Sequence, residues 1–162
     1  MRRRAAAAVV LLLVALLGTY LWLYPPLFLI DAGDYNRTTV EAVDSNGTTL
    51  ATVEVRVAET REQRRIGLMR TDSLDENEGM LFVHPRADDQ QYIMDNMDFP
   101  IDIIFIDSDG TVTEIRNASV PGEGEDGPYT GYGKYVLEVN RGWAAANGLD
   151  VGDTVRLPDE YQ

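Results

Sequence analysis

Cysteine is absent from this 162-residue sequence, and histidine occurs once, as His84. Without cysteine the chain has no disulfide scaffold, no thiol nucleophile and no cysteine ligand for zinc or an iron–sulfur cluster. A single histidine excludes a metal site built from several histidines and leaves one place for a histidine-based acid–base pair. We therefore expect no metal site and no cofactor.

Positive charge is also scarce: 14 basic residues stand against 27 acidic ones, which gives a net charge of −13. A surface this acidic repels phosphate backbones, so nucleic acid is a poor partner. Beyond Arg2–Arg4 the basic residues are ten arginines and one lysine, Lys134. Abundant short acidic side chains with almost no lysine are typical of proteins adapted to molar salt, which screens the repulsion. We predict a halophilic domain.

Charge is missing altogether from Ala5 to Ile30, directly after the basic residues 2–4. A helix over 5–24 has 20 residues and, at about 1.5 Å per residue, spans about 30 Å, the thickness of a bilayer's hydrocarbon core. Pro25-Pro26 then ends the helix. The pattern predicts a cytoplasmic flank (1–4), a transmembrane anchor (5–24), a tether (25–39) and a domain outside the cell membrane (40–162), with the lipid bilayer as a partner.

A secretory signal that is cleaved off is the alternative, and it would leave a secreted protein. Such signals have a shorter apolar region, of about 7–15 residues, and a small-x-small cleavage site. Here the apolar run is longer, and the best small residues downstream are the isolated Ala32-Gly33. The single-pass anchor is therefore favoured. Three Asn-x-Ser/Thr sequons fit an outside location and are glycosylation candidates: Asn36, Asn46 and Asn117.

Short β-rich runs separated by turn residues fill the rest of the sequence. Val40–Val43 and Thr48–Val57 flank an Asn-Gly turn, which predicts a β-hairpin. Thr60 and Gln63 fit a capping box that starts a helix from Arg61 to about Arg70. Further predicted elements are strands at 79–83, 90–94, 100–106, 111–116, 135–140 and 154–157, and a short helix at 143–147.

The segment Val120–Gly133 differs from its surroundings, since it holds five glycines, two prolines and three acids. A stretch of this length without regular structure is unusual in a compact domain and is often functional. The whole pattern predicts a mainly β fold, as an antiparallel β-sandwich or a partly closed barrel. It would carry two short helices and follow one transmembrane helix.

A series of motifs runs through most of this domain. In order they are Thr60-x-x-x-Arg64-x-x-Gly67-Leu68-Met69, Gly79-Met80-Leu81-Phe82, Met94-x-Asn96, Pro100-Ile101-Asp102-x-x-Phe105, Gly110, Tyr135-Val136-Leu137-Glu138 with Gly142, and Gly148-x-x-x-Gly152-Asp153. The series resembles domain of unknown function family 192 over about residues 50–157. The resemblance implies a compact β fold and no settled activity. Two places depart from the family pattern, because Ile93 and Asp95 stand where relatives usually have Trp and Lys.

Two acidic residues, Asp102 and Glu138, lie within apolar strands, where an unpaired carboxylate costs several kcal/mol. Candidate partners are Arg64 or Arg65 from the predicted helix and the amide of Asn96. Two interpretations stay open: a buried polar network that holds the fold, or the polar floor of a pocket beside the glycine-rich segment. In the second, three tyrosines are available to stack on a ligand: Tyr92, Tyr129 and Tyr132.

No nucleophile–base arrangement is visible, which favours a binding or accessory module for a small polar ligand, a saccharide or an envelope protein. An enzyme would have to use carboxylates, as a hydrolase acting on a glycan, with Asp102, Glu138, Asp95 or Asp98 as acid and base. A purely structural envelope protein is the third hypothesis. His84, directly before Pro85, is interpreted as a loop residue rather than a catalyst.

Overall fold

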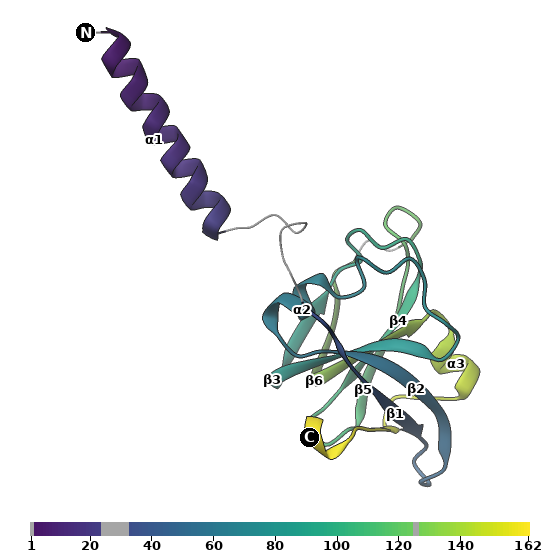
Figure 1. Ribbon diagram of the computed structural model, residues 1–162. Coiled ribbons are helices and arrows are strands. Elements are labelled where there is room, and N and C mark those ends of the chain that lie inside the picture. Colours follow the sequence, from purple (N-terminus) through teal and green to yellow (C-terminus); the bar gives the residue numbers. More distant parts are fainter. Residues whose placement is uncertain (1, 24–32, 125–126) are drawn as a thin grey trace. The chain divides into compact units, whose positions relative to one another are not determined.

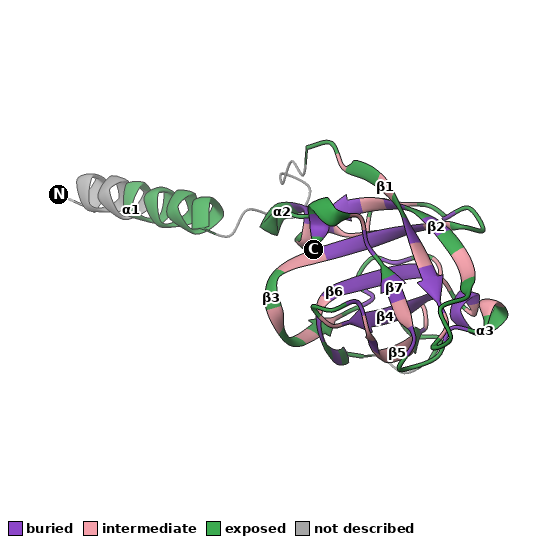
Figure 2. Cartoon of the chain, turned by 90° about the horizontal axis from the view of Figure 1, so that it is seen from below, coloured by how far each residue is buried: buried purple, intermediate pink, exposed green. Residues whose placement is uncertain are grey.

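The computed structural model describes residues 2–23, 33–124 and 127–162 (Figure 1). The chain forms two compact units, Met1–Ala32 and Gly33–Gln162. The first contains the helix α1 (Arg2–Leu23), whose residues 11–23 are exposed (Figure 2). Within the described residues, none of the helices is both long and apolar enough to cross a membrane, so the predicted transmembrane helix is not supported. Residues 25–32 of the predicted tether lie outside the described residues.

The second unit is built on one seven-stranded sheet with the order β5-β4-β6-β3-β2-β1-β7. β2 and β3 pair parallel, and every other neighbouring pair is antiparallel. The strands are β1 (Asn36–Val43), β2 (Thr49–Ala58), β3 (Glu78–Tyr92), β4 (Ile101–Ile106), β5 (Val112–Ala118), β6 (Tyr129–Asn140) and β7 (Thr154–Arg156). The mainly β prediction is confirmed, whereas the β-sandwich alternative is wrong because all seven strands belong to one sheet.

The sheet curls, and its two edge strands meet at one end. The N–H of Val112 donates to the carbonyl of Asp153, and the carbonyl of Val112 accepts from the N–H of Gly152, both at 2.8 Å. The N–H of Val155 donates to the carbonyl of Gly110, also at 2.8 Å. These bonds join the start of β5 to β7, so the sheet forms the partly closed barrel that the sequence predicted (Figure 1).

Three short helices accompany the sheet: α2 (Arg61–Ile66), α3 (Trp143–Asn147) and the 3-10 helix η2 (Asp159–Tyr161), where two were predicted. α2 starts with the predicted capping box, since Thr60 accepts from the N–H of Gln63 and Gln63 accepts from the N–H of Thr60. α2 ends at Ile66 rather than near Arg70, because Gly67 adopts a positive φ of 51° that leaves the helical path. α2 and α3 lie on opposite sides of the curled sheet (Figures 1 and 2).

Other predicted boundaries also change. β1 begins at Asn36, inside the predicted tether, and the two strands predicted at 79–83 and 90–94 are one long strand, β3. Its pairing with β6 is irregular between Val83 and Asp88, which accommodates Pro85. The segment predicted as an irregular loop, 120–133, contains the first five residues of β6.

Two apolar clusters bury both faces of the sheet. Alternate residues of β6 divide between them: Leu137 and Val139 join the first, whereas Val136 joins the second with Phe82 and Phe105. The first cluster also takes in Trp143 and Leu149 beside α3 and Leu157 and Tyr161 near the end of the chain. The second also takes in residues from the segments around it: Leu68, Leu74, Met94 and Met97. The strands are buried accordingly (Figure 2), and we call the face of the second cluster the Phe82 face.

Candidate functional site

Asp102 has a structural role. It is 0% exposed, and its carboxylate accepts three hydrogen bonds, from Asn117 Nδ2 at 2.6 Å and from the backbone N–H groups of Gly142 at 3.0 Å and Ala144 at 3.1 Å. The two backbone donors belong to the start of α3, where N–H groups have no partner within the helix. Asp102 therefore satisfies the beginning of α3 and ties it to β4. This is the buried polar network of the first interpretation.

Glu138 lies on the neighbouring strand but on the other face of the sheet. It pairs with Met80 of β3 and Ile103 of β4, whereas Asp102 pairs with Val139. Paired residues share a face, and successive residues alternate. The carboxyl group of Glu138 therefore points to the Phe82 face and that of Asp102 to the opposite one.

Glu138 is a buried residue of the Phe82 face. Glu138 is 6% exposed and makes no hydrogen bond within the described part of the chain, and neither Arg64 nor Asn96 binds it as predicted. Burial raises the pKa of Glu138 to about 8. At neutral pH the group is therefore a neutral acid whose O–H can donate a hydrogen bond.

Tyr92 stands beside Glu138 on the same face. Its ring packs edge-on against Phe82 and Phe105, with centroids 5.1 and 6.0 Å away. Burial raises the pKa of Tyr92 well above its usual value; the Glu138 charge raises it further and the Arg64 charge lowers it. The charges of Arg64 and Glu138 therefore act on Tyr92 in opposite directions. The structure brings together three of the predicted residues: Arg64, Tyr92 and Glu138.

His84 completes this group, which we call the Tyr92 cluster: Arg64, His84, Tyr92 and Glu138. The imidazole Nε2 lies 2.9 Å from the Tyr92 hydroxyl. Burial lowers the pKa of His84 to about 4, and the nearby Arg64 charge lowers it as well, so the imidazole is neutral at neutral pH. Sequence reasoning missed this residue, because nothing in the sequence shows that an irregular strand brings positions 84 and 92 together.

Arg64 is held in place by backbone carbonyl groups. Its Nη1 donates to the carbonyl of Val83 at 2.9 Å and to that of Glu59, which ties α2 to β3. Among the described residues Arg64 forms no ion pair with a carboxylate. Its positive charge is therefore held within the Tyr92 cluster without an ion pair to a described carboxylate.

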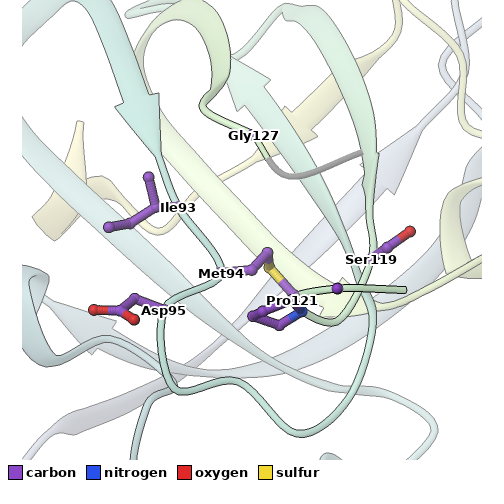
Figure 3. Close-up of a pocket in the computed structure, with 7 residues that line it drawn as sticks. Ile93, Met94, Asp95, Ser119, Pro121 and Gly127 are labelled. Atoms are coloured by element: carbon purple, nitrogen blue, oxygen red, sulfur yellow. The ribbon is translucent and has the colours of Figure 1, made fainter. Parts of the chain in front are cut away.

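A cavity of about 300 Å³ lies where three chain segments meet, as Figure 3 shows. Ile93, Met94 and Asp95 come from the segment after β3, Ser119, Pro121 and Gly122 from the segment after β5, and Gly127 from the segment before β6. The walls are mainly apolar. Ile93 is 58% exposed, Asp95 is also exposed, and Met94 is buried beneath them.

Two features of this cavity connect it to the sequence. Ile93 and Asp95, the two departures from the family pattern, both line it. Ser119 is fixed by its neighbours, since its hydroxyl accepts from Arg141 Nη1 at 2.8 Å and its N–H donates to the hydroxyl of Tyr129 at 3.2 Å. The cavity thus offers one exposed carboxylate and one oriented hydroxyl among apolar walls.

The remaining predicted pocket residues lie elsewhere. Asn96 has a positive φ of 53° and follows Asp95 in a turn closed by a hydrogen bond from the N–H of Met97 to the carbonyl of Met94, a position that Asn tolerates well. Tyr129 is buried and Tyr132 is 47% exposed, and neither lines the cavity. Stacking of a ligand on these tyrosines stays a prediction.

The three sequon residues are all exposed. Asn46 lies in the β1–β2 turn, where its N–H donates to Asp44. Asn36 Nδ2 donates to Glu59 beside a polar hollow of about 440 Å³, and Asn117 Nδ2 already binds Asp102. A sugar would least disturb the fold at Asn46.

The geometry does not support a paired-carboxylate hydrolase that uses Asp102 and Glu138 together. Such an enzyme needs two carboxyl groups about 5–9.5 Å apart across an open cleft. Asp102 and Glu138 are both buried and point to opposite faces of the sheet. In the described ranges, no group of three or more acidic or histidine residues could hold a metal ion.

Comparisons with known proteins agree with the motif series. A family model described as "DUF192: Uncharacterized ACR" matches residues 41–157. A solved structure from Sinorhizobium meliloti 1021, described as a candidate transcription regulator, is similar with a TM-score of 0.70 and 29% identity, covering 78% of this chain and 97% of that one. A protein of unknown function from Novosphingobium aromaticivorans DSM 12444 has a TM-score of 0.67 and 31% identity, covering 75% and 85%. No curated protein matches.

Proposed function

Because the chain belongs to the DUF192 family, whose description assigns no activity, we propose a function from the cavity itself: the domain binds a small molecule with an apolar body and an amine. The observation that carries this proposal is the cavity of about 300 Å³ lined by Ile93, Met94 and Asp95 on one side and Ser119 and Pro121 on the other. Ligand pockets combine apolar walls with a few placed polar groups, as here, and begin at about this volume.

The charge at the cavity supports an amine rather than an acid. Asp95 is exposed at its rim, and the whole chain carries −13, so an anionic ligand is repelled and a cationic one attracted. Ile93, Met94 and Pro121 supply apolar contact for the body of the ligand. A saccharide is less suited, because no aromatic ring is among the described lining residues.

Matched probes of one length test the proposal. Hexylamine, hexanol and hexanoate share an apolar tail and differ in the charge of the head group. Titrated into the full-length protein, hexylamine should shift the backbone amide NMR signals of Asp95, Ser119 and Gly122 saturably. Hexanol should bind more weakly, and hexanoate should not bind.

Two variants locate the binding. Asp95→Asn should weaken hexylamine binding about fivefold, because an exposed charge pair contributes about 1 kcal/mol or less. Asp98→Asn removes the same charge from an exposed residue outside the cavity lining and should change the affinity little. Unsaturable shifts, or equal losses in both variants, would contradict a ligand site here and leave the purely structural role.

We also propose, from the sequence alone, that the amino end associates with the cell membrane and the domain lies outside it. The support is the uncharged run from Ala5 to Ile30 behind three arginines. Fractionation of native cells in high salt is the test. Recovery of the full-length protein in the membrane fraction after a carbonate wash is expected, and recovery in the cytosol would contradict it.

A further inference from the structure

The structure also carries a polar site that the proposed amine cavity does not use. We propose that Arg64, Tyr92 and Glu138 bind an oxyanion, the carboxylate or phosphate group of a small ligand. None of these residues lines the cavity at Asp95, so this inference does not depend on the proposed function. It also calls for a ligand group of the opposite charge.

Arg64 supplies the positive charge. Five other arginines form ion pairs with carboxylates: Arg37, Arg56, Arg86, Arg116 and Arg156. Arg64 forms none within the described residues, and it differs from the other arginines without a described ion pair, Arg61, Arg65 and Arg141, because it is half-buried whereas they are exposed. Two backbone carbonyls hold its Nη1, and a guanidinium has five N–H donors in a fixed plane. The donors left over are suited to a planar or tetrahedral anion.

Glu138 is the second group of the proposed oxyanion site. Glu138 is 6% exposed and its carboxyl group makes no hydrogen bond in the described ranges, so its hydrogen-bonding capacity is left for a ligand. Burial keeps the group protonated at neutral pH, because its pKa is raised to about 8. A neutral acid donates its O–H, and an oxyanion is the natural acceptor. An ionised Glu138 would instead repel the ligand.

Tyr92 and His84 add to the same set of donors. The Tyr92 hydroxyl lies 2.9 Å from His84 Nε2 and can accept from a neutral imidazole N–H while it donates its own hydrogen to a ligand. The edge-on packing of Tyr92 against Phe82 and Phe105 fixes the ring in this position. Arg64, Tyr92 and Glu138 together thus present three kinds of donor and no obligatory acceptor.

The single histidine makes this proposal directly testable. His84 Cε1–H gives one imidazole signal in the NMR spectrum of the full-length protein, and it reports on the Tyr92 cluster alone. Inorganic phosphate and acetate are titrated separately at neutral pH, with KCl adjusted to keep the ionic strength constant. A saturable shift of the His84 signal is expected with at least one of them, and the comparison identifies the preferred anion.

Variants separate binding from general salt effects. Arg64→Gln should weaken the saturable binding at least about tenfold, since it removes the charge-assisted bonds. Arg65→Gln is the matched control, because it removes the same charge from the exposed neighbouring residue, and it should bind as the wild type does. Tyr92→Phe keeps the ring and removes the hydroxyl, and it should weaken binding several-fold.

Two outcomes would overturn the proposal: shifts that stay linear with both anions, or equal affinities in the Arg64→Gln and Arg65→Gln variants. The fold of Arg64→Gln has its own check. Its backbone amide NMR spectrum should keep the signal dispersion of the wild type, and the His84 pKa should stay below its ordinary value, because burial is the main cause that lowers it. Tyr92→Phe keeps the proposal testable if Arg64→Gln fails to fold.

Discussion

At the scale of single residues, Asp102 and Glu138 are both acids within apolar strands, but they differ in their hydrogen bonding. Both interrupt apolar strands that neighbour each other in the sheet. Asp102 accepts three hydrogen bonds and secures α3, whereas Glu138 makes none within the described residues. A buried acid without donors keeps its proton. Glu138 therefore gives the domain a group whose charge depends on pH.

This property predicts a pH dependence of stability. The folded protein holds the Glu138 proton up to about pH 8, whereas an unfolded chain releases it near the ordinary value of 4.5. Between these values the folded state binds more protons, so the free energy of unfolding falls as the pH rises, by up to about 1.4 kcal/mol per pH unit. Urea unfolding of the wild type and of Glu138→Gln from about pH 5 to about pH 8 measures it.

Comparing the wild type with Glu138→Gln cancels the contributions of the other titratable groups. Glu138→Gln keeps the size of the side chain and cannot ionise, so the difference between the two curves isolates Glu138. His84 acts in the opposite direction, since its lowered pKa makes stability rise with pH from about 4 to 6.5, but it does so in both proteins. Parallel curves would mean that Glu138 is ionised in the folded state.

The Tyr92 cluster was partly predictable for a related reason. A carboxylate in an apolar strand needs partners wherever it lies, which pointed to Glu138 and to Arg64 of the predicted helix as its candidate partner. The face on which each acid lies could not be predicted, because β4 and the second half of β6 are apolar at nearly every position. A pocket beside the glycine-rich segment was predicted, and Pro121, Gly122 and Gly127 of that segment line the cavity. Its other walls were not predicted, because they come from turns, which carry no periodic pattern.

At the scale of the elements, glycine explains why β6 is longer than predicted. A Cβ atom at Gly131 would lie 2.4 Å from Cγ of Phe105, and one at Gly133 would lie 2.6 Å from the carbonyl oxygen of Ile106. The glycines therefore let β6 pass close to β4. In the sequence, the five glycines within the fourteen residues 120–133 had instead suggested a loop. Elements set by local contacts, such as the hairpin turn and the capping box, were predicted correctly. The strands β4, β5 and β7 were also predicted to within two residues, whereas the joining of two predicted strands into β3 and the early start of β6, which depend on distant contacts, were not predicted.

A substitution at Gly131 tests this close approach. Gly131→Ala should destabilise the domain by about 1–3 kcal/mol, since the added methyl group overlaps the Phe105 ring. Phe105→Leu alone should also destabilise it, through lost packing. The double variant should cost clearly less than the sum of both, as measured by urea unfolding. Additive effects would mean that Gly131 is needed for another reason, such as backbone freedom.

At the scale of the whole molecule, the curled sheet is buried on both faces, and the proposed binding groups belong to one of them, the Phe82 face. Polar groups at the first cluster have partners: the Tyr135 hydroxyl donates to the carbonyl of Tyr161 at 2.6 Å, and Asp102 accepts three hydrogen bonds beside α3. The Phe82 face is covered only by turns and short segments. Among the described residues, the Tyr92 cluster lies on this face, and Met94 joins that face to the cavity. We therefore expect ligand binding to alter the covering segments more than the barrel.

The acidity of the whole chain predicts that salt stabilises the fold. A net charge of −13 opposes folding unless salt screens it, and the Debye length falls from about 8 Å at 0.15 M to about 3 Å at 1 M salt. The free energy of unfolding of the full-length protein in urea should therefore rise between these KCl concentrations.

A variant with Asp72, Glu76 and Asp98 changed to Lys reverses three exposed charges that make no hydrogen bond or ion pair in the described ranges. It should be more stable than the wild type at low salt and gain less from added KCl, whereas the same three sites changed to Ser should give an intermediate gain. Greater wild-type stability in dilute buffer than in concentrated KCl would refute salt adaptation, because it would show that repulsion between surface acids is not what the salt relieves.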